Sequence, residues 1–458
     1  MPRRRRDRLP GHADRLRPAS SIASGGTAMV LSLLFAAGIL SDTDLGLILR
    51  NLTMLVAWVS VALGLIRVLA CLTPRRVAAA PIAEHDLPDY TILLPLFREA
   101  HMVDGLVHSL TALDYPKDKL DIILICEACD ALTIRRAQQV AKPPFRVLIV
   151  PETDPGGEPQ TKPRALNYAL SRSRGELVTI FDAEDRPHPD QLRDAASAFA
   201  AHPDWVALQA PLLYFNTSDS RLAAQFGLEY AGLFTVLLPF YDRAGLPFPL
   251  GGTSNHMRRA ELEAVGGWDA YNVTEDADLA FRLAALGGRI GWIAPPTKEE
   301  AVSSLRPWMR QRSRWIKGYI QTWLVHMNRP LSGGWRRVVM LQLTLGLSLL
   351  SVLFYAPVIL YLTLFAIASF SGLIESPMPG VYLGALGVSL ACGMAVGAIG
   401  AVRAGQFRLL AHVPLMPLYW LMLFPPFMAA LFELRTRPFH WHKTEHGVTA
   451  APPGKTGR

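Results

Sequence analysis

The chain has 458 residues, of which 50% are hydrophobic and 18% are charged. This balance, with a mean hydropathy of +0.22, excludes an ordinary soluble protein and fits a soluble domain joined to membrane spans. The net charge is +8, and residues 1–20 contribute seven arginines against two aspartates. Such a tail can bind nucleic acid, but an apolar run follows it directly. We therefore interpret it as a basic cytoplasmic tail that orients a span, with no nucleic-acid partner.

Four cysteines are too few for a disulfide scaffold. Two of them, Cys126 and Cys129, have the C-x-x-C spacing, but no second pair completes a zinc site. The pair also ends an apolar strand, whereas a redox pair is expected at the start of a helix. Neither redox chemistry nor metal binding is expected here.

Residues 21–76 are predicted to form two transmembrane helices. The first apolar run, 21–40, carries no charge, and the second, 52–72, contains only Arg67, near its end, where it can snorkel to the interface. A second run so close behind the first argues against a cleaved signal peptide. Basic residues precede the first run and follow the second. The positive-inside rule therefore places the next domain in the cytoplasm.

From Leu87 the pattern changes to short β-rich runs that alternate with helical ones. This alternation predicts a doubly wound α/β domain with a mostly parallel sheet at 87–302. Ligands of such sheets bind at the carboxyl ends of the strands, where Glu99, Asp130 and Asp182 fall. The expected strands are 90–96, 121–126, 146–150 and 177–181, and the expected helices are 100–113, 133–140, 163–171 and 190–201.

Two amphipathic helices are expected after this pattern ends, at 221–240 and 303–327. The second is rich in Trp and Arg, which is typical of a helix along a membrane surface, so 303–330 is predicted to be an interface helix. Its Gln311 and Trp315 share one face, four residues apart.

Residues 338–434 are predicted to return to the membrane. Two runs, 338–370 and 381–402, are joined by a loop without Lys or Arg, as expected outside the cell. The run 409–434 contains four prolines, and a clean span there would place the basic tail 435–458 outside. A broken or re-entrant segment with the tail in the cytoplasm is favoured. Splitting the first run into two spans would also place the tail in the cytoplasm, because it changes the number of crossings by one.

An acidic cluster, Asp182-Ala183-Glu184-Asp185, ends the last expected strand, so its carboxylates emerge together at the sheet edge. A hard cation such as Mg²⁺ or Mn²⁺ binds one or two carboxylates and completes its shell with phosphate oxygens and water. An acid-rich turn ahead of Pro187 is the alternative explanation.

Two further motifs carry charge. Thr274-Glu275-Asp276 is predicted to begin a helix, where threonine can act as the N-cap and acidic side chains are stabilised. This stabilisation alone would explain the presence of one or two of the acids. Arg314 lies in a basic stripe of the helix at 303–327, and a guanidinium suits a diphosphate because it donates two parallel hydrogen bonds. A solvated basic face is the alternative for Arg310, Arg312 and Lys317.

In this order and spacing the motifs resemble those of the membrane-bound family 2 glycosyltransferases, such as cellulose, chitin, hyaluronan and curdlan synthases, over residues 87–330. The resemblance implies a GT-A-type cytoplasmic domain combined with an α-helical transmembrane region in a plasma membrane, the inner membrane in a bacterium. It implies an inverting hexosyltransferase that uses a nucleoside-diphosphate sugar, usually a UDP-sugar, and extends a β-linked polysaccharide. Partner subunits are left open.

Two alternatives remain. Ceramide glucosyltransferases also pair acidic motifs with (Q/R)-x-x-R-W, and they transfer one sugar to a lipid acceptor. A catalytically inactive scaffold is the third interpretation, because Glu184, Ala128 and Cys129 depart from the family pattern.

The resemblance also assigns roles. It implies that Asp276, beside Glu275, deprotonates the acceptor, that Arg314 contacts the diphosphate, and that Trp315 supports the acceptor sugar. The metal, Mg²⁺ or Mn²⁺, is expected on Asp182 and Glu184, with Asp185 as the alternative second ligand because the family pattern is Asp-x-Asp. The other residues placed at the substrates are Pro95, Phe97, Glu99, Asp130, Lys162, Asn167, Gly252, Thr253 and Gln311.

Overall fold

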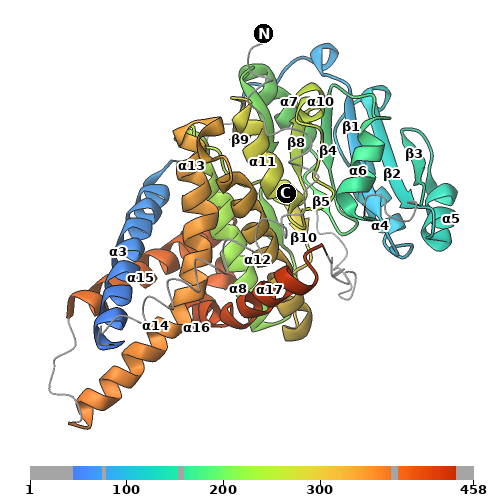
Figure 1. Cartoon of the computed structure of the whole chain (residues 1–458). Helices are drawn as coiled ribbons and strands as arrows, with labels where there is room; N and C mark the ends of the chain where they lie inside the picture. The colour runs from blue at the N-terminus through green and yellow to red at the C-terminus, as the bar shows by residue number, and fades with distance from the viewer. Residues whose placement is uncertain (1–44, 75–78, 153–158, 373–379, 440–458) are drawn as a thin grey trace.

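A computed structural model describes residues 45–74, 79–152, 159–372 and 380–439. An α/β body occupies one side of the molecule and a group of long helices the other (Figure 1). The basic tail, the first expected span and most of the C-terminal tail lie outside the described residues.

A seven-stranded sheet forms the centre of the α/β body, in the order β3-β2-β1-β4-β8-β6-β9. Only β8 runs antiparallel to its neighbours. This confirms the predicted mostly parallel sheet. The strands are β1 (Tyr90–Leu96), β2 (Leu120–Glu127), β3 (Phe145–Val150), β4 (Leu177–Ile180), β6 (Trp205–Gln209), β8 (Asn255–Arg258) and β9 (Arg289–Trp292).

The central strands are apolar on both faces because helices cover both faces of the sheet. In β1, Ile92 and Leu94 pack into one hydrophobic core, and Leu93, between them, packs into the other. Side chains alternate along a strand, so a continuous apolar run supplies both cores. The helices of this body are α4 (Val103–Thr111), α5 (Ala131–Val140), α6 (Lys162–Leu170), α7 (Gln191–Ala201), α10 (Arg259–Ala264) and α11 (Glu275–Ala285), with short 3₁₀ turns at Glu84–Asp86, Lys117–Lys119 and Pro330–Gly333.

A second sheet of three short strands stands at the carboxyl edge of the first. Its order is β5-β10-β7. These strands are β5 (Arg186–Pro187), β7 (Leu212–Tyr214) and β10 (Thr297–Glu299). The small sheet brings the end of β10 beside the acidic loop that follows β4, since β10 pairs with β5.

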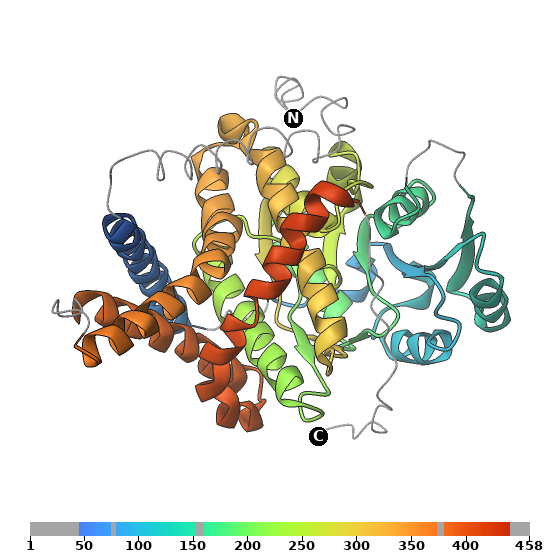
Figure 2. The ribbon, with the colours of Figure 1, turned by 60° about the horizontal axis from the view of Figure 1, so that its bottom comes forward.

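Among the described residues, four helical stretches are long and apolar enough to cross a membrane, at 221–243, 335–370, 383–403 and 407–436. The turned view in Figure 2 shows these helices beside the α/β body. The elements are α3 (Leu45–Leu72), α8 (Arg221–Gly232), a π-helical turn (Leu233–Leu237), α9 (Leu238–Arg243), α12 (Leu305–Met327), α13 (Trp335–Leu341), a second π-helical turn (Gln342–Gly346), α14 (Leu347–Phe370), α15 (Gly380–Arg403), a 3₁₀ segment (Phe407–Leu415), α16 (Met416–Leu421) and α17 (Phe424–Thr436).

The helix at 221–243, which includes the amphipathic helix predicted at 221–240, is covered along most of its length. Only its ends, Arg221 and Arg243, are exposed. It packs on α15 so closely that a Cβ on Gly400 would lie 2.4 Å from the Gly232 nitrogen. The α/β body covers its other side. The helix predicted at 221–240 is therefore packed against other elements on both sides.

The proline-rich run breaks into the 3₁₀ segment, α16 and α17. Gln406 before the run donates to the Tyr214 carbonyl at 2.8 Å, and Pro438 after it accepts from Gln321 at 3.0 Å. One end of the run therefore contacts the small sheet and the other contacts α12. The re-entrant path of this segment remains a prediction.

Candidate active site

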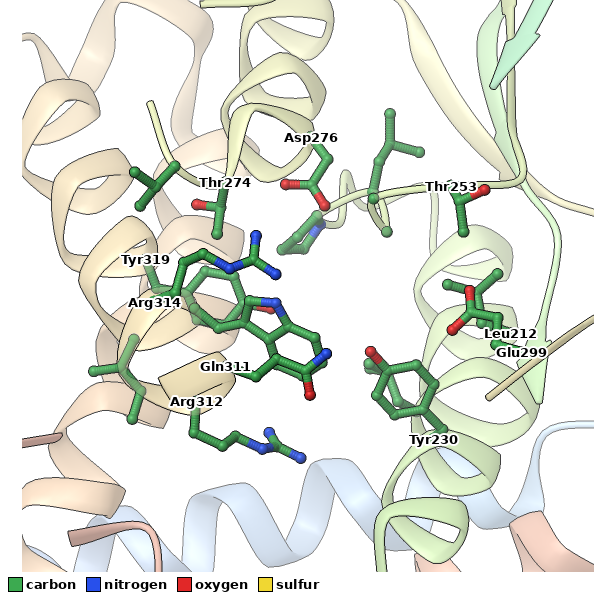
Figure 3. A pocket seen from close by; sticks show the side chains of 18 of the residues that line it. Leu212, Tyr230, Thr253, Thr274, Asp276, Glu299, Gln311, Arg312, Arg314 and Tyr319 are labelled. Atoms are coloured by element: carbon green, nitrogen blue, oxygen red, sulfur yellow. The ribbon is translucent and has the colours of Figure 1, made fainter. Parts of the chain in front are cut away.

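A cavity of about 620 Å³ lies where the carboxyl edge of the sheet meets the helices (Figure 3). Asp130, Asn167 and Asp185 do not line it. The other residues named from the sequence do: Pro95, Phe97, Glu99, Lys162, Asp182, Glu184, Gly252, Thr253, Glu275, Asp276, Gln311, Arg314 and Trp315. Segments more than 200 residues apart in sequence thus meet in one cavity.

The acidic loop after β4 is tied to the glycine loop before β8. Asp185 accepts from the Asp182 backbone N–H at 2.7 Å and from the Thr253 hydroxyl, which folds the loop back on itself. The Lys162 ammonium forms an ion pair with Asp182 and donates to the Gly252 carbonyl at 3.0 Å. Burial would lower the pKa of Lys162, but Asp182 and Glu275 raise it overall. The lysine is a fixed cation between the two loops.

The wall opposite this lysine carries an excess of carboxylates. Burial raises the pKa of Glu184 to about 8, and the nearby Asp182 and Glu99 add to the rise. Burial also raises the pKa of Asp185 and of Glu299, which lies at the end of β10. Buried like charges disfavour the ionised form of each group. A bound cation would relieve this repulsion.

Asp276 points into the cavity from the first turn of α11 (Figure 3). One carboxylate oxygen accepts from the Ala277 N–H at 2.8 Å, and the other lies 3.4 Å from where a Cβ on Gly252 would be. Burial raises the pKa of Asp276, although the Ala277 N–H, Lys162 and Arg314 oppose the rise. Burial thus outweighs the lowering expected at a helix start, which makes the carboxylate a stronger base.

Thr274 takes the N-cap position of α11, but its side chain makes no capping bond. The Asn272 carboxamide oxygen accepts from the Thr274 N–H at 3.0 Å, and its nitrogen donates to the Thr322 hydroxyl of α12 at 3.0 Å. The start of α11 is therefore positioned by α12. Sequence reasoning missed Asn272 because its partner is 50 residues away.

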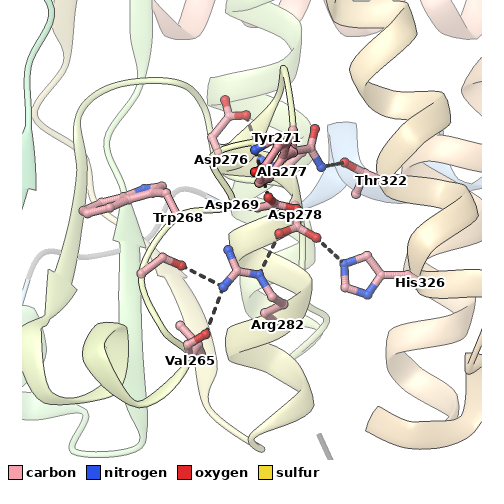
Figure 4. A network of polar contacts seen from close by, with 12 residues as sticks. Val265, Trp268, Asp269, Tyr271, Asp276, Ala277, Asp278, Arg282, Thr322 and His326 are labelled. Atoms are coloured by element: carbon pink, nitrogen blue, oxygen red, sulfur yellow. Dashed lines mark hydrogen bonds and ion pairs between the residues drawn. The ribbon is translucent and has the colours of Figure 1, made fainter. Parts of the chain in front are cut away.

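The third acid of the helix start, Asp278, anchors α11 from behind (Figure 4). It pairs with Arg282 at 2.6 Å and with His326 Nε2 at 2.9 Å, and Arg337 donates to His326 Nδ1 at 2.7 Å. Since Nδ1 accepts, His326 is neutral with its proton on Nε2. Burial opposes ionisation of Asp278, but Arg282 and His326 keep its pKa well below the usual range. Asp278 is a structural carboxylate.

The helix α12 faces the cavity with aromatic and basic side chains. Arg314 lies below Asp276 in Figure 3. The Trp315 ring stacks on Tyr230 at a centroid distance of 6.1 Å and 29° between planes, and it contacts Phe226 at 5.8 Å. A flat aromatic surface in a cavity suits a ring-shaped ligand.

Arg312 and Lys317 do not form the solvated basic face that was the alternative explanation. Both are buried. Arg312 pairs with Glu229 through two hydrogen bonds and reaches the Tyr419 hydroxyl at 2.6 Å, and Lys317 pairs with Glu433 at 3.0 Å. They join α12 to α8, α16 and α17. Of the basic residues named on this helix, Arg310 is the exposed one.

Two residues that the sequence analysis placed at the substrates, Asp130 and Asn167, form hydrogen bonds within the protein. Asp130 caps α5 through the Thr133 N–H at 3.2 Å and accepts from the Arg98 N–H, so it holds the turn after β1. Asn167 forms two hydrogen bonds to the Trp268 backbone, at 2.7 and 2.8 Å. Both side chains fix loops around the cavity. Glu127, at the end of β2, lines the cavity, and the substrate contacts expected of Asp130 and Asn167 remain predictions.

Gly318 lies where α12 crosses the start of α11. A Cβ there would lie 2.4 Å from the Thr274 hydroxyl oxygen and 2.8 Å from its Cβ, and Thr274 is buried. Gly318→Ala should therefore displace the start of α11 and lower the transfer rate by about tenfold or more, since small misplacements of a reacting group are costly. Gly105→Ala in α4, where a Cβ meets nothing within 4 Å, is the matched control and should keep the rate. Equal rates for both variants would contradict this packing argument.

Carboxylates and fixed cations at the carboxyl edge of a parallel sheet suit the transfer of a group from a nucleoside diphosphate. This combination of fold and site defines the class of GT-A glycosyltransferases. Two family models match the chain: Glycosyl transferase family group 2 at residues 177–432 and Glycosyl transferase family 2 at residues 91–260. The first match covers more than half of the chain, which therefore belongs to the family 2 glycosyltransferases.

The names of two relatives refer to different kinds of product, one a glycolipid and the other a polysaccharide. The β-monoglucosyldiacylglycerol synthase of Synechocystis is 27% identical over 261 residues, 55% of this chain and 52% of the relative. Glucomannan 4-β-mannosyltransferase 2 of Arabidopsis thaliana is 25% identical over 246 residues, 52% of this chain and 45% of the relative. The chain thus spans about half the length of these relatives.

A solved mannosyltransferase from Pyrobaculum calidifontis, in complex with GDP-Man and Mn²⁺, superimposes with a TM-score of 0.55 and 19% identity. The match covers 85% of this chain and 99% of that one. This similarity confirms the predicted GT-A fold.

Proposed function

We propose that the chain transfers a sugar, with inversion, from a nucleoside-diphosphate sugar to a hydroxyl group of a membrane lipid. The observation that carries the choice of acceptor is the continuity of the cavity. It runs from the buried carboxylates past Trp315 into a space between the membrane helices, where most of the lining is apolar. The lining there includes Leu237, Leu238, Leu343, Leu345, Leu349, Val352, Val396, Met416 and Leu423.

The acceptor hydroxyl loses its proton to Asp276, and its oxygen attacks the anomeric carbon as the bond to the diphosphate breaks. Arg314 and Lys162 are the nearby cations that offset the charge on the leaving group, because both interact with the carboxylates of the site. In-line displacement of an α-linked donor gives a β-linked product. The catalytic domain is expected on the cytoplasmic side, where nucleotide-sugars are found.

A divalent cation, Mg²⁺ or Mn²⁺, fits the acidic loop. One oxygen of buried Asp185 has no hydrogen-bond partner, and the carboxylates around it repel one another. Within the described residues no three acidic, His or Cys side chains are already gathered into a metal site. Asp182 and Glu184 would hold the ion together with phosphate oxygens, and the ion would supply positive charge to the leaving diphosphate.

Polysaccharide synthesis, favoured by the sequence analysis, is the second candidate. The stacked pair of Trp315 and Tyr230 supports it, since an aromatic face can hold a sugar ring. A growing glycan, however, would pass from this pair into a space lined by leucine and valine, which offers few partners for its hydroxyls. The apolar lining therefore favours a hydrocarbon chain.

Product length separates the two acceptors. Membranes that contain the full chain are supplied with a panel of radiolabelled UDP- and GDP-sugars, and the products are extracted into organic solvent and analysed by mass. We expect lipid products with one sugar. A water-soluble polymer at saturating donor would replace the lipid proposal with the polysaccharide.

Removal of divalent metal should lower the transfer rate at least about tenfold, because the cation carries charge that arginine and lysine do not replace. The measurement is the rate in EDTA with the metal content checked, followed by recovery in Mg²⁺ or Mn²⁺. Full turnover without metal would overturn the assignment.

Mn²⁺ binding with UDP or GDP present, measured by electron paramagnetic resonance, should weaken in Asp182→Ala. If Glu184→Ala retains Mn²⁺ binding, the second ligand is another carboxylate.

A further inference from the structure

Arg67 is a charged residue in the membrane part of the chain, within α3, and it lines the same cavity as the catalytic groups. The sequence analysis expects this side chain to snorkel toward the helix end. The structure directs it inward instead, against α15, where it lies beside Gly393 and Trp420 packs closely on the same glycine. A Cβ on Gly393 would lie 3.6 Å from the Arg67 guanidinium. A side chain in place of this glycine would fill that space.

The guanidinium has little within the protein to bind. Among the residues that the structure describes, its one hydrogen bond goes to the Ser389 carbonyl at a long 3.5 Å, and no carboxylate forms an ion pair with it. A guanidinium carries five N–H donors, so most of them face the cavity unused. Charged side chains at membrane depth are costly, and they are retained where they bind a partner or a substrate.

Tyr241, on α9, is the polar neighbour of Arg67 in this part of the cavity. Its ring is buried, it lines the cavity, and it interacts electrostatically with the guanidinium. Its phenol hydroxyl can donate one more hydrogen bond to a ligand of the same cavity. Several donors and one positive charge form a site for an anion with two or more oxygens, which a guanidinium binds in a bidentate manner.

The surroundings decide which anion enters. Leu237, Leu238 and Val396 line the cavity near these groups, so a free hydrated anion would lose its water for a largely apolar wall. An anion attached to a hydrocarbon chain gains from the same wall. The cavity is also continuous with Asp276 and Trp315. One cavity therefore contains the guanidinium, an apolar wall and the proposed base.

We propose that Arg67 and Tyr241 bind the phosphate group of the lipid acceptor, so that the enzyme selects a phosphate-bearing lipid. This inference rests on the proposed transfer to a lipid. It places recognition of the phosphate at the membrane end of the cavity and proton removal at Asp276. The lipid therefore needs both a phosphate and a free hydroxyl.

Binding tests the site without a sugar donor. The purified full chain in detergent is titrated with dioleoylphosphatidylglycerol and with dioleoylglycerol, which share their acyl chains and each carry a free hydroxyl but differ in the phosphoglycerol head group, and complexes are counted by native mass spectrometry. We expect the wild type to bind the phospholipid at least about tenfold more tightly, as charge-assisted hydrogen bonds allow. Arg67→Gln should lose this preference, and Arg67→Lys should keep part of it. Equal affinity of the wild type for the two lipids would overturn the proposal.

The matched control is Arg408→Gln. Arg408 lies at the start of the proline-rich run, is exposed and does not line the cavity, so its variant should keep the preference. Loss of preference in both variants would show that surface charge, not the cavity, attracts the lipid. Thermal melting of each variant excludes loss of folding, and Arg67→Lys keeps the test valid if the glutamine variant unfolds.

Transfer kinetics then distinguish an acceptor from a resident phospholipid. With both lipids as acceptors, Arg67→Gln should raise the KM for dioleoylphosphatidylglycerol about tenfold more than the KM for dioleoylglycerol. If binding depends on Arg67 but this KM does not, the phosphate belongs to a bound membrane lipid and the acceptor assignment is wrong. If the wild type glycosylates neither lipid, the proposed function fails, while the binding titration still decides the phosphate site.

Discussion

Asp276→Asn is expected to lower the rate of sugar transfer at least about a hundredfold, the lower end of general-base contributions. The amide keeps the size of the side chain and can keep the contact with the Ala277 N–H, so the start of α11 should not move. The substitution removes the carboxylate that takes the proton from the acceptor hydroxyl. Affinity for UDP or GDP should barely change, because the carboxylate does not bind the nucleotide. Initial rates and nucleotide titrations on purified protein measure both quantities.

Asp278→Asn, two residues away, is the contrasting variant. Its carboxylate pairs with Arg282 and His326 in a buried network, and removal of one partner from such a network is strongly destabilising. We expect a lower melting temperature for Asp278→Asn and an unchanged one for Asp276→Asn. If Asp276→Asn transfers at a nearly normal rate, the base lies elsewhere, and Glu275 is the next carboxylate to test.

Much of the α/β body follows from local sequence pattern. The strand expected at 90–96 forms with those bounds, and three others shift by only one residue at either end. Continuous apolar runs bounded by polar turns have few other ways to be buried, so the pattern determines the element. The carboxylates at strand ends are predictable for the same reason, since parallel strands deliver their carboxyl ends to one edge.

The side-chain contacts that the sequence analysis did not predict are those whose partners are distant in sequence. Asn167 reads as a donor-site amide, yet it clamps the Trp268 backbone, 101 residues away. Arg312 reads as a solvated cation until Glu229 and Tyr419, from two other helices, are seen to enclose it. A local pattern reports the charge of a side chain but not the partner that neutralises it.

Glu299 is a cavity carboxylate that the sequence analysis did not find. It belongs to β10, a strand of three residues, and its sequence carries neither alternation nor a motif. The small sheet exists because β10 pairs with β5 and β7, which is a tertiary event. No reading of residues 297–299 alone would place a carboxylate beside the acidic loop.

Trp315→Ala is the second variant with a large expected effect, about a hundredfold loss of transfer with nucleotide affinity kept within a few-fold. The indole stacks on Tyr230 and forms the aromatic surface on which the acceptor would rest, so its removal takes away orientation and leaves the donor site built. Alanine is the best helix former, and α12 is held by the ion pairs of Arg312 and Lys317, so unfolding is not expected.

Arg314→Ala, one residue away, should give the opposite pattern. Its guanidinium lies beside Asp276, and in the proposed mechanism it offsets the charge of the diphosphate, so nucleotide affinity should fall together with the rate. Isothermal titration with UDP and GDP, run beside initial rates for both variants, separates the two outcomes. If Trp315→Ala and Arg314→Ala weaken nucleotide binding equally, α12 is not divided between acceptor and donor. A divided helix explains why two neighbouring side chains would fail in different ways, because successive residues of a helix point about 100° apart and reach different walls of one cavity.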